Sequence, residues 1–259
     1  MTSALDHARH SAPRLVLITG CLGGIGRALV EEFSASGYVV LGTDLPETAP
    51  VEGVVPDVYV SCDLARFCVE ADYRVAVLAQ IKGQAKGRLS TLVNNAAWQV
   101  VKPIEQLSAD DWVKSQNVNV MAPFLLTQGL LAELEAEQGS VVNVASIHAQ
   151  LTKPEFVAYA TSKAALVGMT RALAVELGAR VRVNALCPAA IATPMLVAGF
   201  DGRPARYQEL ADMHPVGRIG QPAEAARAAR LLADGGLGFM TGATLQLDGG
   251  IGARLHDPV

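Results

Sequence analysis

The sequence predicts a single α/β domain built on a doubly wound parallel sheet with helices on both faces. Short apolar runs rich in β-branched residues alternate with segments of helical periodicity along the chain. Parallel strands need long, right-handed connections, so this alternation is typical of a parallel sheet covered by helices. The chain has 259 residues and shows no internal repeat or composition shift, which favours one core.

The expected strands are short apolar runs, and the expected helices are longer segments whose apolar residues recur every three or four positions. We expect residues 1–13 to form a flexible tail and residues 14–259 to form the domain. The strands comprise residues 15–19, 39–42, 91–94, 141–145, 181–186 and 244–247. The helices comprise residues 26–36, 112–137, 158–178 and 224–234.

One segment, at about residues 192–222, breaks the alternation of strands and helices. Long irregular insertions in compact domains are usually functional, so we expect a substrate loop here. The segment mixes glycines and polar residues with four prolines, which are Pro194, Pro204, Pro215 and Pro222.

Composition and charge exclude several classes of function. Hydrophobic residues make up 51% of the chain and charged residues 18%, as in a globular protein, and the net charge of -4 comes without a basic run for nucleic acid. The four cysteines lack metal-site or disulfide-scaffold spacing, which favours reduced thiols and no metal. No segment is apolar enough for a signal peptide or a membrane span. We therefore expect a cytoplasmic protein without nucleic-acid or membrane partners.

A glycine-rich turn follows the first expected strand and leads directly into a helix. It reads Thr-Gly-Cys-Leu-Gly-Gly-Ile-Gly over residues 19–26, with glycines at Gly20, Gly24 and Gly26. Glycine permits a sharp turn and close approach of a pyrophosphate, and the helix N-terminus directs N–H groups at that anion. The alternative is an ordinary glycine-rich turn, because such a pattern is weak evidence by itself.

The second expected strand ends near an acidic residue, Asp44, eighteen positions beyond Gly26. A carboxylate at this place accepts hydrogen bonds from both ribose hydroxyls of an adenosine and repels a 2′-phosphate. The glycine turn holds Cys21 and Leu22 and offers no basic residue to neutralise such a phosphate. The sequence therefore predicts NAD rather than NADP, the alternative being that Asp44 is only a polar strand end.

Tyr159 and Lys163 stand four residues apart, early in an expected helix, and this spacing places them on one face. A phenol has a pKa of about 10, so it needs a nearby positive charge to act as a base near neutrality. Lys163 supplies such a charge, whereas an exposed pair formed by chance is the alternative. Ser146, which follows an expected strand, and Asn119 complete the set of candidate catalytic residues.

With these residues the sequence resembles the short-chain dehydrogenase/reductase family, and the resemblance covers nearly the whole chain. It implies a Rossmann sheet and a homotetramer packed through the helices at 112–137 and 158–178. Ala97 and Ala189 depart from the family pattern, because glycine is usual at both places. The matching motifs are residues 19–26, Asp63-Leu64, residues 94–97, Asn119, Ser146, Tyr159 with Lys163, residues 188–193, Thr241-Gly242 and residues 248–250.

The resemblance implies a role for each matched residue. Tyr159 would be the general acid/base, Lys163 would lower its pKa and hold the nicotinamide ribose, and Ser146 would bind the reacting oxygen. Asn119 would hold a water in a proton relay, although an asparagine in a helix can also simply bond a backbone carbonyl. The implied cofactor-binding residues are Gly20, Leu22, Gly24, Ile25, Gly26, Asp44, Asp63, Leu64, Asn94, Ala96, Tyr159, Lys163, Pro188, Ile191 and Thr193.

The segment that begins at Ser146 is similar to that of the glucose 1-dehydrogenases of this family, which oxidise an aldose to a lactone. We expect polar and flat side chains suited to a polyhydroxylated ring to bind the substrate, although His148 could equally be an ordinary loop histidine. Reduction of a 3-oxoacyl thioester and a non-catalytic NAD-binding regulator stay open as alternatives. The candidate substrate residues are Trp98, Gln99, His148, Gln150 and Lys153.

Two further groups of residues receive weaker interpretations. Lys153, Arg203 and Arg206 would meet an anionic group on the substrate, or they form a solvated face. Residues 252–259 lie beyond the last expected strand and would reach a neighbouring subunit's pocket or form a frayed terminus.

Overall fold

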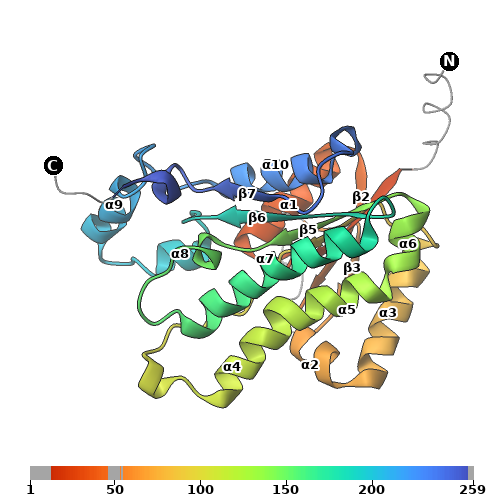
Figure 1. Ribbon diagram of the computed structural model, residues 1–259, viewed down its shortest axis with the longest axis horizontal. Helices are drawn as coiled ribbons and strands as arrows, with labels where there is room; N and C mark the ends of the chain where they lie inside the picture. The colour runs from red at the N-terminus through yellow and green to blue at the C-terminus, as the bar shows by residue number, and fades with distance from the viewer. Residues whose placement is uncertain (1–12, 46–52, 54, 256–259) are drawn as a thin grey trace.

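The computed structural model describes residues 13–45, 53 and 55–255. Within them, seven strands form one parallel sheet in the order β3-β2-β1-β4-β5-β6-β7, which confirms the predicted fold class (Figure 1). Of the expected tail at residues 1–13, residues 1–12 lie outside the described residues, as do residues 256–259. The strands are β1 (Arg14–Thr19), β2 (Tyr38–Asp44), β3 (Val58–Ser61), β4 (Thr91–Asn94), β5 (Ser140–Val144), β6 (Arg182–Pro188) and β7 (Thr244–Leu247).

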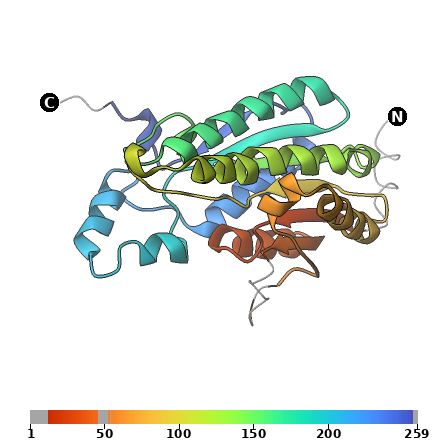
Figure 2. The ribbon, with the colours of Figure 1, turned by 90° about the horizontal axis from the view of Figure 1, so that it is seen from below.

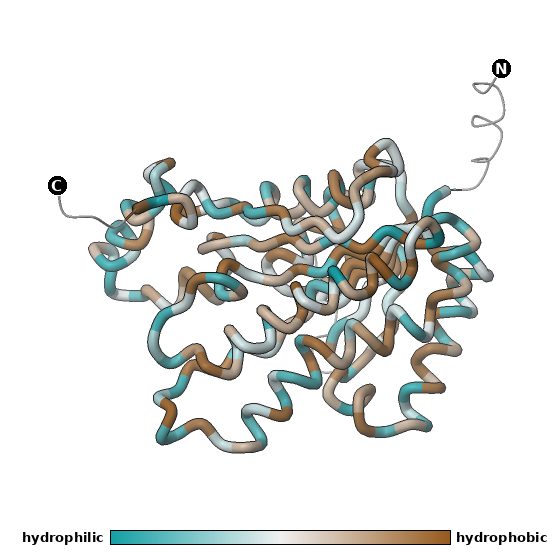
Figure 3. Tube along the Cα trace, in the orientation of Figure 1, coloured by the Kyte–Doolittle hydropathy of each residue, from teal (hydrophilic) through white to brown (hydrophobic). Residues whose placement is uncertain are grey.

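The helices cover both faces of this sheet (Figure 2). Residues of β1 point alternately to the two sides: Leu17 packs in a core with α3, α5 and α7, whereas Val16 and Ile18 pack in a core with α1 and α10. Apolar residues accordingly gather along the central strands (Figure 3). The helices are α1 (Gly24–Ala35), α2 (Leu64–Val69), α3 (Ala71–Ala85), α4 (Ala109–Gln116), α5 (Ala122–Gly129), α6 (Leu131–Ala136), α7 (Val157–Leu177), α8 (Pro194–Ala198), α9 (Pro204–Asp212) and α10 (Pro222–Ala233).

The structure corrects three details of the expected elements. The sequence reading missed β3, α2 and α3 between the second and third expected strands. The segment at 192–222 is not irregular throughout, because α8 and α9 lie within it, each with proline in its first turn. The expected helix at 112–137 is divided, with a π-helical stretch (Asn117–Met121) between α4 and α5.

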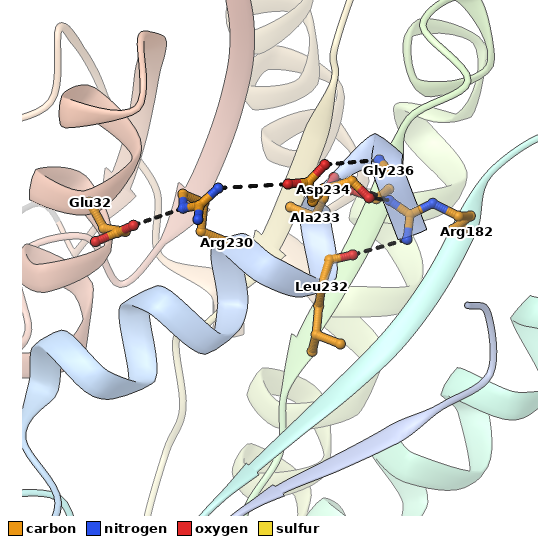
Figure 4. A network of polar contacts seen from close by, with 8 residues as sticks. Glu32, Arg182, Arg230, Leu232, Ala233, Asp234 and Gly236 are labelled. Atoms are coloured by element: carbon orange, nitrogen blue, oxygen red, sulfur yellow. Dashed lines mark hydrogen bonds and ion pairs between the residues drawn. The ribbon is translucent and has the colours of Figure 1, made fainter. Parts of the chain in front are cut away.

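The C-terminal end of α10 is held by Arg182, which stands at the start of β6 (Figure 4). Its guanidinium donates to the backbone carbonyls of Leu232 at 3.0 Å, Ala233 at 3.1 Å and Asp234 at 2.9 Å. These carbonyls have no partner inside the helix, so the guanidinium replaces the missing bonds. Arg230 joins α10 to α1 through an ion pair with Glu32 at 2.8 Å.

The topology also fixes the place of the site. β1 pairs with both β2 and β4, so the strand order reverses between β1 and β4. In open parallel sheets, ligands bind beyond the carboxyl ends of the strands at such a reversal. Among the residues that the structure describes, no helix has both the length and the apolar character that crossing a bilayer requires.

Candidate active site

A cavity of about 700 Å³ opens beyond the carboxyl ends of the strands. Its lining combines residues that follow β4, β5 and β6 with residues from α7, from the α8–α9 segment and from the stretch after β7. The cavity brings together three of the four candidate catalytic side chains, which are Ser146, Tyr159 and Lys163.

The glycine turn forms the cofactor end of the site, and its backbone admits no larger residue at two positions. Gly20 has φ +64°, and a Cβ there would lie 2.9 Å from the Cα of Ala96. A Cβ at Gly26 would lie 1.9 Å from the carbonyl oxygen of Gly20. Within the described residues no side chain caps α1 at Gly23, so the first N–H groups of this helix have no capping side chain as acceptor. This cradle fits the pyrophosphate of a dinucleotide.

Gly24 lies against the segment that follows β6. A Cβ at Gly24 would lie 2.7 Å from the Cβ of Thr193, so the two chain segments approach within contact distance. Thr193 itself caps α8, since its hydroxyl accepts from the Leu196 N–H at 3.2 Å. Ile25, Pro188, Ile191 and Thr193 all line the cavity, as expected for residues assigned to the cofactor.

Asp44 ends β2 beside the glycine turn. One carboxylate oxygen accepts from the Leu22 N–H at 2.9 Å, and the other accepts from the Leu45 N–H at 2.9 Å. These bonds fix the carboxylate at the edge of the turn, where a ribose of a bound dinucleotide would come within reach.

The other residues assigned to the adenosine half serve the fold as well. Asp63 caps α2, because its carboxylate accepts from the N–H groups of Ala65 at 2.8 Å and Arg66 at 3.2 Å. Leu64 is buried in the core on the α3 side of the sheet. Neither side chain lines the cavity.

Two sets of polar connections hold β4 in place. Thr19 at the end of β1 accepts from the N–H groups of Asn95 and Ala96, both at 3.0 Å, while the Asn95 amide donates to the carbonyls of Thr19 and Gly20. Asn94 donates to Asn143 on β5 at 2.8 Å. Asn143 in turn donates to Thr170 on α7 at 2.9 Å, which joins both strands to the helix of Tyr159.

Tyr159 and Lys163 meet in the cavity, with the lysine Nζ 5.6 Å from the centre of the tyrosine ring. The ammonium donates to the carbonyl of Val144 at 2.8 Å, and Lys163 as a residue is 2% exposed. Burial lowers the pKa of Lys163 to about 8. Burial also raises the pKa of Tyr159 to about 12, and the hydrogen bond with Ser146 opposes this rise. The phenol therefore needs further positive charge to ionise near neutrality, and a bound nicotinamide cation would add it.

Asn119 lies in the π-helical stretch and is 1% exposed. Its amide closes a clamp on Trp98, accepting from the Trp98 N–H at 2.7 Å and donating to the Trp98 carbonyl at 2.9 Å. The amide also donates to Ser162 at 2.8 Å, and Ser162 donates to the Tyr159 carbonyl at 2.7 Å. The asparagine side chain thus bonds backbone, which the sequence left open, and its place in a proton relay stays a prediction.

Three of the five candidate substrate residues line the cavity, namely Gln99, His148 and Lys153. The His148 ring stacks on Phe156 with centroids 4.5 Å apart and lies edge-on to Tyr159 at 5.8 Å. Its Nδ1 lies 3.0 Å from the hydroxyl of Thr152. Burial, and then the charge of Lys153, lowers the pKa of His148, so the ring is neutral near pH 7.

The structure places the other polar candidates outside the cavity lining. The Trp98 ring lies 3.6 Å from the ammonium of Lys114 at the surface, and Gln150 is exposed. Arg206 pairs with Glu209 at 3.0 Å, and Arg203 donates to the carbonyl of Gly199. Of the five candidate substrate residues, Gln99, His148 and Lys153 therefore stay as predicted substrate contacts.

Comparison with known proteins agrees with this geometry. A family model described as "Enoyl-(Acyl carrier protein) reductase" matches residues 20–252. The 2,5-dichloro-2,5-cyclohexadiene-1,4-diol dehydrogenase of Sphingobium indicum is 36% identical over 248 residues, which span 93% of this chain and 97% of that protein. The chain belongs to the short-chain dehydrogenase/reductase family. It is therefore a nicotinamide-dependent oxidoreductase that acts on CH–OH donors.

Two other members of the family are similar over nearly their whole length. The D-threitol dehydrogenase of Mycolicibacterium smegmatis is 32% identical over 247 residues, with 92% of each chain covered. The ligand-free structure of Thermoplasma acidophilum aldohexose dehydrogenase superposes with a TM-score of 0.86 at 28% identity, covering 95% of this chain and 97% of that one.

Proposed function

We propose that the protein is an NAD-dependent dehydrogenase that oxidises a secondary or hemiacetal hydroxyl on a small hydroxylated ring, as a sugar 1-dehydrogenase does. The observation that carries the proposal is the meeting of Ser146, Tyr159 and Lys163 in one cavity with the neutral imidazole of His148. Proton-transfer groups and hydrogen-bonding groups for a second hydroxyl are thereby present in the same space.

Each catalytic side chain has one task in this proposal. Ser146 holds the reacting hydroxyl, Tyr159 takes its proton as a phenolate, and the ammonium of Lys163 favours that phenolate electrostatically. A bound nicotinamide would accept the hydride from the carbon that carries this hydroxyl, while the hydroxyl proton goes to Tyr159. In the reverse direction the Tyr159 hydroxyl returns the proton to the carbonyl oxygen.

NAD is the proposed cofactor because Asp44 stands fixed at the edge of the glycine turn. Its carboxylate would accept from the ribose hydroxyls, and a 2′-phosphate would meet the same negative charge at close range.

The substrate class is proposed from the cavity and from what relatives act on. Their names state a cyclohexadiene diol, D-threitol and an aldohexose, each of which carries more than one hydroxyl. Gln99, His148 and Lys153 would bind such additional hydroxyls.

Initial rates with a panel of alcohols test the proposal directly. The panel contains aldoses, sugar acids, cyclic diols, open-chain polyols and a 3-hydroxyacyl thioester, each with NAD and with NADP, and reduced-cofactor absorbance is the readout. We expect the highest kcat/KM with NAD and a ring alcohol. Preference for the thioester with NADP would identify a thioester reductase, and tight NAD binding without any turnover would identify a non-catalytic regulator.

The role of His148 is tested with two variants. His148→Phe keeps a ring to stack on Phe156 and removes both nitrogens, whereas His148→Ala removes the ring as well. We expect both to raise KM for hydroxylated rings by about tenfold, the size of a lost hydrogen bond to a buried neutral group. Unchanged KM and kcat for every active substrate in both variants would remove His148 from the substrate site.

We also propose a homotetramer. Large apolar side chains lie at the surface of α4 and α5, with Trp112 38%, Val113 52% and Phe124 37% exposed. Exposed apolar groups of this kind are typical of subunit interfaces. Light scattering of the wild type and of Phe124→Glu tests the assembly, and a monomeric wild type would contradict it.

A further inference from the structure

One part of the cavity wall is apolar and comes from chain segments that carry none of the catalytic residues. The α8–α9 segment contributes side chains from both helices and from the turn after α9, and the stretch after β7 contributes one more. The five side chains are Met195, Leu196, Leu210, Met213 and Ile251, which we call the apolar wall.

Backbone bonds hold the two sources of the apolar wall together. An isolated bridge between Ile191 and Gly220 closes the base of the α8–α9 segment. Near the C-terminal end of this segment, the Val216 N–H donates to the Gly249 carbonyl at 3.2 Å. This bond ties the segment to the residues that follow β7. The apolar wall is therefore formed by the α8–α9 segment and the residues after β7 together.

A tight turn brings the last of these side chains to the cavity. Asp248 accepts from the N–H groups of Gly250 at 2.9 Å and Gly252 at 3.1 Å, and Gly249 and Gly250 have φ +58° and +87°. Only glycine adopts such angles without strain. The Asp-Gly-Gly sequence thus reverses the chain so that Ile251 lines the cavity.

The polar groups on this side of the cavity are already engaged or covered. The Thr193 hydroxyl caps α8. His214 is 3% exposed and its Nδ1 lies 2.8 Å from the Leu210 carbonyl, whereas its Nε2 is covered by the surrounding atoms and has no hydrogen-bond partner among the described residues. By contrast, the segments after β4 and β5 and the start of α7 present polar side chains to the cavity, among them Gln99, Ser146, His148, Thr152, Lys153 and Tyr159.

We infer that the substrate is an amphipathic ring alcohol, with its hydroxyls gathered at one edge and hydrocarbon at the other. This inference rests on the proposed function and narrows its substrate, because it favours ring alcohols with a hydrocarbon edge over aldoses that carry oxygen on every ring carbon. The hydroxylated edge meets the polar side chains around Tyr159, and the hydrocarbon edge packs on the apolar wall. Each buried methylene on such a wall favours binding by about fourfold. A hydroxyl pressed against the wall loses its water without gaining a partner, which disfavours a fully hydroxylated ring by about ten- to a hundredfold.

The test compares two substrates with the same carbon ring. Cyclohexane-1,2-diol carries two adjacent hydroxyls, whereas myo-inositol carries a hydroxyl on every carbon. We expect the wild-type enzyme with NAD to show a kcat/KM at least about tenfold higher for the diol. Calorimetry with the NADH-loaded protein measures the same preference as binding, and a negative heat-capacity change for the diol would mark burial of its hydrocarbon.

Two variants place the preference on the apolar wall. Leu210→Asn and Ile251→Thr add a polar group at nearly constant size, one in each chain segment. We expect each to lower the ratio of the two kcat/KM values by about fivefold or more. Val197→Thr is the matched control, because Val197 lies in α8, is 49% exposed and does not line the cavity, so the ratio stays unchanged.

The outcomes separate this inference from the proposed function. Equal or inverted preference in both turnover and binding, or wall variants with an unchanged ratio, would overturn the amphipathic substrate. Absence of turnover for every alcohol, with the binding preference for the diol retained, would overturn the proposed dehydrogenase and leave the recognition by the apolar wall standing.

Discussion

Replacing Lys163 by methionine removes the ammonium that lies 5.6 Å from the centre of the Tyr159 ring and keeps a side chain of similar length. Two opposite unit charges at this distance attract by about 3 kcal/mol at an effective dielectric constant of 20, which is equivalent to about two pKa units. Loss of the ammonium destabilises the phenolate, so the pKa of Tyr159 rises in Lys163→Met. The Tyr159 pKa is already raised to about 12 by burial in the ligand-free protein, so this charge matters for ionisation.

The assay is the pH dependence of kcat/KM for alcohol oxidation at saturating NAD, from about pH 6 to about pH 11. Oxidation needs the phenolate, so kcat/KM rises with pH up to the apparent pKa. We expect this ascending limb to move about two pH units higher in Lys163→Met. At a fixed pH on the limb, kcat/KM then falls by about a hundredfold.

The charge of Lys163 itself depends on pH. Burial lowers the pKa of Lys163 to about 8, so in the ligand-free protein the ammonium is present below that pH and is lost as pH rises through it. Fluorescence titration with NADH serves as the control for cofactor binding. An unmoved limb together with weakened NADH binding would refute the electrostatic role and leave Lys163 as a cofactor ligand only.

The remaining predictions concern the cofactor and stability. Asp44→Asn keeps an acceptor for the Leu22 N–H but removes the charge, so we expect kcat/KM with NAD to fall about tenfold or more while that with NADP does not; a parallel fall with both would contradict the assignment. In Gly26→Ala the Cβ would lie 1.9 Å from the Gly20 carbonyl oxygen, so denaturant unfolding should show a free energy of unfolding lower by about 3 kcal/mol. The control is Gly83→Ala in α3, where the Cβ meets open space and the free energy of unfolding should rise by about 0.5 to 1 kcal/mol. Arg182→Met removes the guanidinium from three carbonyls at the end of α10, of which only those of Ala233 and Asp234 keep another donor among the described residues, and should lower the free energy of unfolding by about 2 to 3 kcal/mol. An unchanged urea midpoint would show that water replaces the guanidinium.

The parts of the fold that the sequence predicted are those with strong local periodicity. β1 and β6 are buried on both faces, β1 appears as a nearly continuous apolar run, and α7 has an uninterrupted helical pattern. β3 was missed; it is four residues long, lies at the sheet edge and ends at the exposed Ser61, although β7 has the same length and an edge position and was predicted. Such a strand is defined by its pairing with β2 rather than by its own sequence.

The α8–α9 segment shows a different limit of sequence reasoning. Its prolines predict irregular structure, because proline interrupts a helix or a strand. Pro194 and Pro204 each stand instead in the first turn of a helix, where the missing N–H costs nothing. The Thr193-Pro194 pair carried the relevant signal, because a capping threonine before a proline is a typical helix start.

In the candidate site, the sequence predicted the meeting of Ser146, Tyr159 and Lys163 but not the contacts that depend on tertiary structure. The Asn119 clamp on Trp98 requires the π-helical stretch, for which the sequence has no local signal. The contribution of Ile251 to the cavity depends on the turn at Asp248, which the sequence reading did not connect to the site.

Tyr159→Phe measures the central claim most directly, because it removes one oxygen and keeps the ring beside His148. With NAD and the best alcohol of the panel, we expect kcat to fall by about a thousandfold, the usual contribution of a general acid or base, with the NADH dissociation constant and the melting temperature unchanged. A kcat within about tenfold of wild type, at an unchanged pH dependence, would show that another group moves the proton.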